Sequence, residues 1–120
     1  MNLTIADLKE LISTESKSNN SIDKYLLEKV VIIRTYSAGV HFGTLIEKAG
    51  KEVILRNSRR LWYWKTKNDG ISLSEVAIDG LHKDSRVCAP IPLLWLEAIE
   101  IIPCSEKAIE NIKQQPEYKA

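Results

Sequence analysis

The sequence predicts a single α+β domain: a small antiparallel β-sheet of about five strands with short helices at its N-terminal and C-terminal ends. The chain has 120 residues, of which 44% are hydrophobic and 28% charged, and these values suit one globular core. A continuous β-branched run followed by alternating apolar and polar residues is typical of consecutive strands. Apolar residues at helical spacing mark both ends. We therefore expect a helical appendage (1–28), a sheet core (29–104) and a C-terminal helix (105–115).

The N-terminal appendage begins with a capping-box-like pattern at Thr4, and the apolar spacing after it predicts a helix over about 5–14. The stretch 13–21 contains no large apolar residue, so burial cannot offset the entropy of ordering it, and we expect a mobile connection. Ile22 and Leu26 then predict a short helical turn after that connection.

Three strands are expected next, in the form of an antiparallel meander. The β-branched run 30–33 predicts a strand that is buried on both faces. Residues 40–46 alternate in polarity, and a glycine-containing turn over 48–51 leads into a third strand over 52–55.

A fourth strand is expected over 61–66, and its period of two places Trp62 and Trp64 on the same face. The stretch 71–80 fits both a helix and an alternating strand. We favour a short helix there, with Gly80 as its C-cap.

The last third of the chain contains two prolines that exclude a central strand around them, Pro90 and Pro92. Residues 95–102 predict a final strand. Ser105 is a good N-cap for a helix over 106–114, and the residues from 116 onwards are expected to form a tail.

Charge is unevenly distributed along the chain. Residues 29–66 hold eight basic and two acidic side chains, a net charge of +6 for the segment, against +1 for the whole chain. Four of the five arginines lie in this segment, among several aromatic residues. A guanidinium matches phosphate oxygens and an aromatic face can stack a base, so the mixture suits a phosphorylated nucleotide. The alternative is that Arg56, Arg59 and Arg60 form a solvated turn and that the tryptophans are core residues.

Other functional classes find little support in the sequence. It contains no Walker loop, GxGxxG, nucleophile elbow or HExxH motif. Cys88 and Cys104 form no CxxC pair, and we expect two reduced, mostly buried thiols. His41 and His82 have no ligating neighbour at metal-site spacing. We therefore expect a binding domain without catalysis, metal or cofactor.

No basic-then-apolar leader and no apolar stretch of membrane-spanning length occurs, so a soluble cytosolic protein is expected. The net charge of +1 and the pI of about 7.7 argue against a general binder of duplex DNA or of anionic membranes. A nucleic-acid-binding β-domain, with the same arginines and tryptophans on phosphates and bases, is the second hypothesis.

Four blocks of the sequence carry a resemblance to a known family: residues 34–43, 50–53, 57–62 and 95–104. Together they resemble the type-one Thoeris anti-defence proteins, small phage proteins that act as cyclic ADP-ribose sponges, over about residues 28–112. The resemblance implies a protein that binds glycocyclic ADP-ribose, the signal made by bacterial TIR-domain enzymes, and holds it uncleaved in the cytoplasm of the infected bacterium. It further implies a homo-oligomer, a dimer or a hexamer. Some family members also take up cyclic di- or trinucleotides at separate sites.

The basic segment and the resembling blocks overlap, and the candidate ligand-binding residues are taken from that overlap. We expect guanidinium groups to bind the pyrophosphate, with backbone amides of the 37–39 turn as further donors to it. We expect an aromatic ring to stack on the adenine, and a side-chain amide to bond to a base edge or a hydroxyl group. The candidates are Arg34, Ser37, Gly39, His41, Phe42, Arg56, Asn57, Arg59, Arg60 and Trp62.

Overall fold

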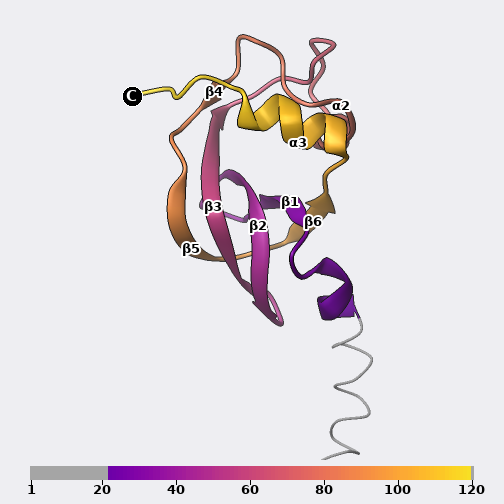
Figure 1. Cartoon of the computed structure of the whole chain (residues 1–120), viewed down its shortest axis with the longest axis vertical. Helices are drawn as coiled ribbons and strands as arrows, with labels where there is room; N and C mark the ends of the chain where they lie inside the picture. The colour runs from indigo at the N-terminus through magenta and orange to yellow at the C-terminus, as the bar shows by residue number, and fades with distance from the viewer. Residues whose placement is uncertain (1–21, 120) are drawn as a thin grey trace, which may run out of the picture.

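The structure is a computed structural model that describes residues 22–119, and it confirms a small α+β domain with an antiparallel sheet (Figure 1). A short helix over 22–26 precedes the other elements. In chain order these are β1 (Val30–Arg34), β2 (Val40–Ala49), β3 (Glu52–Tyr63), α2 (Leu73–Asp79), β4 (Arg86–Val87), β5 (Ile91–Glu97), β6 (Glu100–Pro103) and α3 (Glu106–Lys113). The predicted helix over 5–14 and connection over 13–21 lie outside the described residues.

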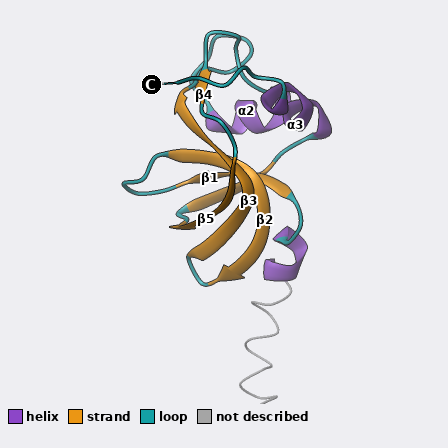
Figure 2. Cartoon of the chain, turned by 60° about the vertical axis from the view of Figure 1, so that its left-hand side comes forward, coloured by secondary structure: helices purple, strands orange, loops and turns teal. Residues whose placement is uncertain are grey.

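The sheet is strongly curled and forms a partly closed barrel. Its strands are hydrogen-bonded in the order β5-β3-β2-β1-β6, and the far end of β3 also pairs with the two-residue strand β4. β5 and β6 follow each other in the chain but lie at opposite ends of this order. The link between them is hydrogen-bonded to the β2–β3 turn and to the end of β1. The Ala98 amide donates to Lys51 O, and the Ile99 amide donates to Arg34 O. Figure 2 shows the curled strands of the sheet, with α2 and α3 at one end of it.

Two hydrophobic clusters lie on the two faces of the sheet. β1 contributes to both, because Val31 and Ile33 point into the barrel while Ile32 points towards the helices. The β-branched run is therefore buried on both faces, as predicted. The cluster inside the barrel contains Val31, Ile33, Leu45, Val53, Leu55, Leu96 and Ala98. The cluster under the helices contains Ile32, Phe42, Leu61, Val76, Ala77, Leu81, Val87 and Ile112.

β3 is one strand of twelve residues, so the predicted division into strands over 52–55 and 61–66 is wrong, and so is the alternative of a solvated turn between them. The strand passes through the basic stretch by means of a bulge. Asn57 has a φ of 53°, and the register with β2 shifts beside Gly43. A Cβ atom on Gly43 would lie 3.2 Å from the Arg56 carbonyl oxygen, which explains a glycine opposite the bulge.

The tryptophan prediction also fails, because β3 ends at Tyr63 and the two indoles do not share a strand face. Trp64 packs against the cluster under the helices, whereas Trp62 is 54% exposed. The predicted single strand over 95–102 is broken between Glu97 and Glu100, where the chain passes from one end of the sheet to the other.

The helical predictions hold in the second half of the chain. The Ser72 side chain accepts from the Glu75 amide at the start of α2, and Gly80 ends that helix. The Ser105 side chain accepts from the Ala108 amide and begins α3. Pro92 lies in β5, which among the described residues pairs with β3 alone, so no central strand forms around it, as expected. Among the described residues, no helix is long and apolar enough to cross a membrane.

Candidate functional site

The arginines of the basic segment do not converge on one point. Arg34 at the end of β1 pairs with Glu100 of β6, with Nε 3.0 Å from the carboxylate. Arg56 in β3 lies 3.4 Å from the Glu28 carboxylate. Both pairs are largely exposed, and their charges are already matched within the chain. Within the described residues of one chain, the four candidate guanidinium groups therefore do not form one cluster.

Arg59 has a structural role that the sequence did not reveal. Its side chain is 5% exposed, and burial lowers its pKa by desolvation, an effect that Glu117 partly offsets. Its Nε donates to Cys88 O at 2.8 Å and its Nη1 donates to Ile112 O at 2.8 Å. The guanidinium thus ties β3 to the residues after β4 and to the last turn of α3.

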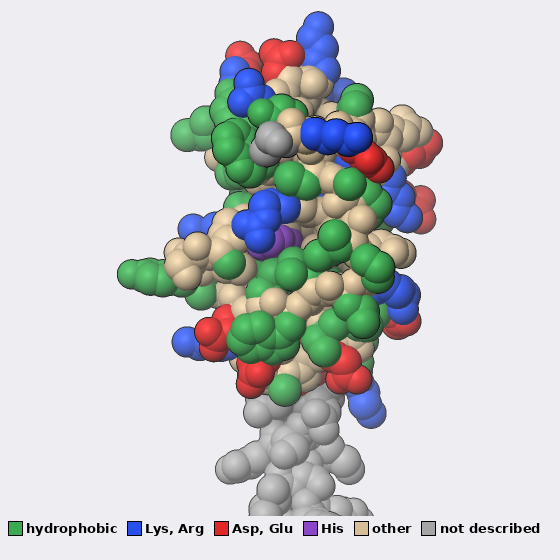
Figure 3. All heavy atoms as spheres, turned by 90° about the vertical axis from the view of Figure 1, so that its left-hand side faces the viewer, with side chains coloured by type: hydrophobic (Ala, Val, Ile, Leu, Met, Phe, Trp, Pro, Cys, Tyr) green, Lys and Arg blue, Asp and Glu red, His purple; other side chains and the backbone are tan. Residues whose placement is uncertain are grey.

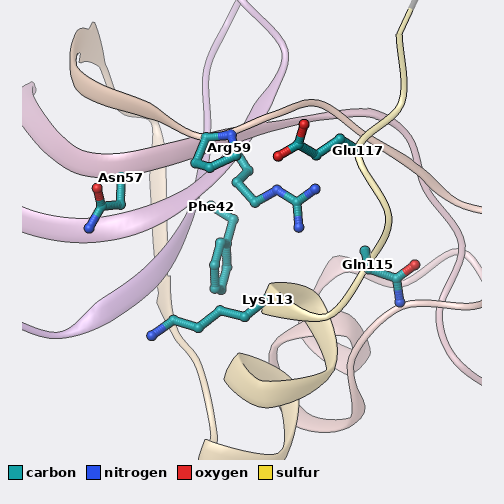
Figure 4. A pocket seen from close by; sticks show the side chains of 7 residues that line it. Phe42, Asn57, Arg59, Lys113, Gln115 and Glu117 are labelled. Atoms are coloured by element: carbon teal, nitrogen blue, oxygen red, sulfur yellow. The ribbon is translucent and has the colours of Figure 1, made fainter.

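Arg59 also lines a pocket of about 250 Å³ beside α3, which we call the C-terminal pocket (Figure 4). The bulge places Asn57 at its edge, and Phe42 lies in its floor, so three of the predicted residues meet there. Phe42 is only 2% exposed, however, and belongs to the cluster under the helices. Arg59 gives its Nε and Nη1 donors to backbone carbonyls, and Lys113 is a second cation in the lining of this pocket.

A second pocket lies on the opposite face of the β2–β3 pair, at the open end of the barrel. This barrel-mouth pocket has a volume of about 140 Å³. The register pairs His41 directly with Arg60, and the bulge brings Ser58 to the same face. Cys88, Ile91 and Leu94 complete most of the wall. Figure 3 shows the molecule from one side, where apolar side chains surround a cationic side chain with a histidine beside it.

His41 lines this pocket and is held as a neutral imidazole. Its side chain is 1% exposed, and desolvation, together with the charge of Arg60, lowers its pKa although the bond to Ala38 opposes this. Nε2 lies 2.8 Å from the Ala38 carbonyl oxygen, which can only accept, so Nε2 carries the proton. Nδ1 is then left with a lone pair, and it has no partner within residues 22–119.

Ser58 presents a second buried polar atom without a partner. Its Oγ makes no hydrogen bond within the described part of the chain, although the residue is 2% exposed. Buried polar groups are almost always hydrogen-bonded, and each exception calls for an unseen partner. Both residues line the barrel mouth, while the two atoms themselves are buried.

A third, larger pocket adjoins the barrel mouth. This loop pocket has a volume of about 360 Å³ and lies between the β1–β2 loop and the β5–β6 link. Ser37 lines it from one side, and Lys51 and Trp95 line it from others. The indole of Trp95 is 56% exposed, and its Nε1 donates to Glu52 at 3.1 Å, so the ring has a fixed edge and an accessible face.

The loop itself is braced from within. The Thr35 hydroxyl accepts from the Ala38 amide and donates to Gly39 O, both at 2.8 Å, and Gly39 has a φ of 85° that favours glycine. Arg60 Nη1 donates to Ala38 O at 3.0 Å. Arg60 lines the barrel mouth and Ala38 lines the loop pocket, so these two hydrogen-bonded residues form the wall between the two pockets.

The structure thus unites some of the predicted residues and separates others. Ser37, Gly39, His41 and Arg60 lie at or beside the two adjoining pockets. Phe42, Asn57 and Arg59 lie on the other face, and Arg34 and Arg56 are in ion pairs. Trp62 lies outside all three pockets and stacks on Tyr118, with ring centroids 5.8 Å apart.

Sequence reasoning missed Ser58, Lys51 and Trp95 as site residues. A continuous strand over 52–63 would have paired Ser58 with Arg60 on one face by its period of two, but the basic stretch suggested a turn instead. No local signal marks Lys51 or Trp95, because the closure of the barrel brings them to the β1–β2 loop.

Comparison with known proteins gives one family match. Residues 28–112 match a family described as a domain of unknown function (DUF6948). No curated protein and no solved structure matches the chain. The matched region contains every residue that lines the barrel mouth and the loop pocket, whereas Lys113 and Glu117 of the C-terminal pocket lie beyond it.

Proposed function

The chain belongs to the family described as a domain of unknown function (DUF6948), and we propose that it binds a phosphate-bearing nucleotide signal and holds it without cleaving it. The ligand that we propose is the glycocyclic ADP-ribose made by TIR-domain enzymes, as the resemblance implies. By removing this signal, the protein would block Thoeris immunity in the infected bacterium. Such a sponge acts by mass action, so it needs tight binding and no catalytic group.

One observation carries the proposal: two adjoining pockets share the wall formed by Arg60 and Ala38. One pocket is lined by the polar residues His41, Ser58 and Arg60. The other has an accessible indole face, Trp95, beside the β1–β2 loop. An aromatic face next to a cation and a set of buried polar groups suits a molecule that combines a base, sugar hydroxyls and phosphates.

We assign the parts of the ligand by chemistry. The indole of Trp95 stacks the base, and Arg60 receives phosphate oxygens with the guanidinium donors that it does not give to Ala38. Lys51 adds a second cation in the loop pocket. Glu97 lines the same pocket, and its charge favours placing the phosphates nearer to Arg60.

The homo-oligomer that the resemblance implies, a dimer or a hexamer, belongs to the same proposal. Exposed apolar side chains on the edge strand β5 support it, because such edges tend to pair or be covered. They are Ile91, Leu93 and Trp95.

A nucleic-acid-binding function is the second candidate, and one surface favours it. The guanidinium of Arg86 lies 6.0 Å from the ring of Trp62 and 5.2 Å from that of Tyr118, and Trp62 is half exposed. Aromatic faces beside a cation are used for stacking single-stranded bases.

The experiment for the sponge function is capture and release. The full chain is incubated with lysate from TIR-activated cells, washed and heat-denatured, and the released molecules are identified by mass spectrometry. We expect an intact cyclic ADP-ribose isomer in stoichiometric amount. A linear or hydrolysed product would indicate an enzyme, and an empty protein would refute the proposal.

Two substitutions then locate the site by isothermal titration with the released molecule. We expect Arg60→Ala and Trp95→Ala each to weaken binding by about tenfold or more, since charge-assisted contacts and stacked bases contribute on the order of 1–3 kcal/mol. Arg56→Ala and Trp62→Ala are the matched controls, because they remove the same residue types from β3 outside the two pockets. Equal losses in the controls would contradict the assignment. Weakened binding of single-stranded DNA by Trp62→Ala would support the second candidate instead.

A further inference from the structure

The C-terminal tail, residues 114–119, docks on β4 in the manner of an added strand. Val87 and Glu117 form a parallel β-bridge, and the Tyr118 amide donates to Val87 O at 2.8 Å. Val87 also pairs with Leu61 of β3, so β3 takes one edge of β4 and the tail takes the other. These are main-chain contacts of the kind that an extended peptide makes when it adds to the edge of a sheet.

The ring of Tyr118 anchors the tail sideways. It stacks on Trp62, with ring centroids 5.8 Å apart and an angle of 27° between the planes. The guanidinium carbon of Arg86 lies 5.2 Å from the centroid of the Tyr118 ring and 6.0 Å from that of Trp62. An aromatic side chain is thus held against an indole and beside a cation, two contacts that favour a large planar anchor residue.

The residue before this anchor meets positive charge. Figure 4 shows Glu117 pointing towards Arg59 at the C-terminal pocket. Burial lowers the pKa of Arg59, and the charge of Glu117 opposes that lowering. Arg59 is fixed by its bonds to Cys88 O and Ile112 O, which do not involve the tail. The surface under the tail therefore suits an acidic residue followed by an aromatic one.

The tail is a replaceable part of this arrangement. The family match covers residues 28–112, so β4 and its neighbours belong to the matched domain and the tail follows it. In the docked state Glu117 is exposed and Tyr118 is only half-buried. One β-bridge and one ring stack hold this end of the chain, against the entropy of ordering it. We therefore expect the tail to be released at a small cost in free energy.

We infer that the outer edge of β4, together with Arg59, Trp62 and Arg86, is a docking surface for an extended peptide in which an acidic residue precedes an aromatic one. The tail of the chain itself occupies this surface, and a partner segment of the same chemistry binds when the tail is released. This inference is independent of the proposed sponge function, which uses the barrel mouth and the loop pocket.

The test uses the full chain and a fluorescent peptide of residues 113–119, with binding measured by fluorescence anisotropy. Tyr118→Ala removes the anchor of the chain's own tail. We expect this variant to bind the peptide at least about tenfold more tightly than the wild type, whose tethered tail competes at a high effective concentration. A peptide that itself carries Tyr118→Ala should not bind. One that carries Glu117→Gln should bind about twofold to fivefold more weakly, as expected for an exposed charge.

Tyr25→Ala is the matched control, because Tyr25 is an exposed tyrosine whose ring contacts Lys29 instead of β4. This variant should bind the peptide as weakly as the wild type does. Hydrogen exchange adds a readout that needs no variant. An excess of unlabelled peptide should displace the tail of the wild type and accelerate exchange of the Tyr118 amide, which donates to Val87 O in the docked state.

Two results would overturn the inference: equal peptide affinity in the wild type and Tyr118→Ala, or no saturable binding to Tyr118→Ala up to millimolar peptide. A Tyr118→Ala protein that binds a single-stranded oligonucleotide but not the peptide would also overturn it, and would assign the surface to the second candidate function. None of these results bears on capture of the nucleotide signal, so the inference and the sponge function fail separately.

Discussion

At the scale of single residues, three arginines of one strand show how position decides the role of a side chain. Arg56 lies on the surface in an ion pair with Glu28. Arg59 is buried and donates to main-chain carbonyls of two distant segments. Arg60 lies one residue further, on the opposite face, and contacts the β1–β2 loop. Their residue type predicts phosphate binding equally for all three, but of the three Arg60 is the one that lines the barrel mouth.

We predict that Arg59→Ala lowers the free energy of unfolding by about 2–4 kcal/mol, because it removes a buried side chain and takes from the Cys88 and Ile112 carbonyls the charged donor that joins them, leaving Ile112 O with the Gln115 amide. Arg56→Ala should change it by no more than about 0.5 kcal/mol, since an exposed ion pair contributes little. Urea denaturation of the two variants measures the difference. Similar losses in both would show that Arg59 does not tie β3 to α3.

At the scale of elements, the junction between α2 and α3 depends on a glycine. Gly80 ends α2 with a φ of 93°, and its amide donates to Val76 O. The next amide, that of Leu81, donates to Asn111 Oδ1 of α3 at 2.7 Å. A Cβ atom on Gly80 would lie 2.4 Å from Asn111 Cγ, so the close approach of the helices requires the absence of a side chain.

Gly80→Ala is therefore expected to destabilise the protein by about 3 kcal/mol or more, from backbone strain together with the clash against Asn111. Gly50→Ala is the matched control, because Gly50 also has a positive φ, of 61°, but nothing lies within 4 Å of its added Cβ. That control should cost only about 1–2 kcal/mol. Chemical denaturation curves that give equal losses would show that the contact with Asn111 relaxes freely.

At the scale of the whole molecule, the fold pairs many of the basic side chains of the segment 29–66 with carboxylates from other parts of the chain. The segment 29–66 carries a net charge of +6. In the fold, four of its eight cations form ion pairs with carboxylates, namely Arg34, Lys48, Arg56 and Lys65. Half of the cations of this segment are therefore neutralised by neighbouring carboxylates, and the site that we propose depends on local geometry.

Global stability should depend on pH through His41. The pKa of this histidine is lowered from 6.5 by burial, so below pH 6.5 the unfolded chain binds protons that the folded protein excludes. The stabilising contribution is complete above pH 6.5 and is lost as the pH falls towards the lowered pKa. The slope from this one group reaches at most about 1.4 kcal/mol per pH unit.

We expect the free energy of unfolding of the wild type to fall more steeply between pH 7 and pH 5 than that of His41→Gln, which keeps a donor for Ala38 O but cannot titrate. Carboxylates contribute equally to both proteins and cancel in the comparison. Parallel curves, or an NMR titration that places the pKa of His41 at or above 6.5, would contradict a desolvated neutral imidazole.

The sequence by itself determined the α+β class, the doubly buried strand at 30–33, the helix caps at Ser105 and Gly80, and the exclusion of a central strand around Pro92, because each depends on local periodicity or backbone chemistry. Only the tertiary structure decided that β3 is continuous, that Arg59 is buried, and that Trp95 and Lys51 meet the β1–β2 loop. These features depend on a bulge and on the closure of a barrel between residues distant in the chain. Such contacts arise from packing between segments, for which local sequence patterns carry no signal.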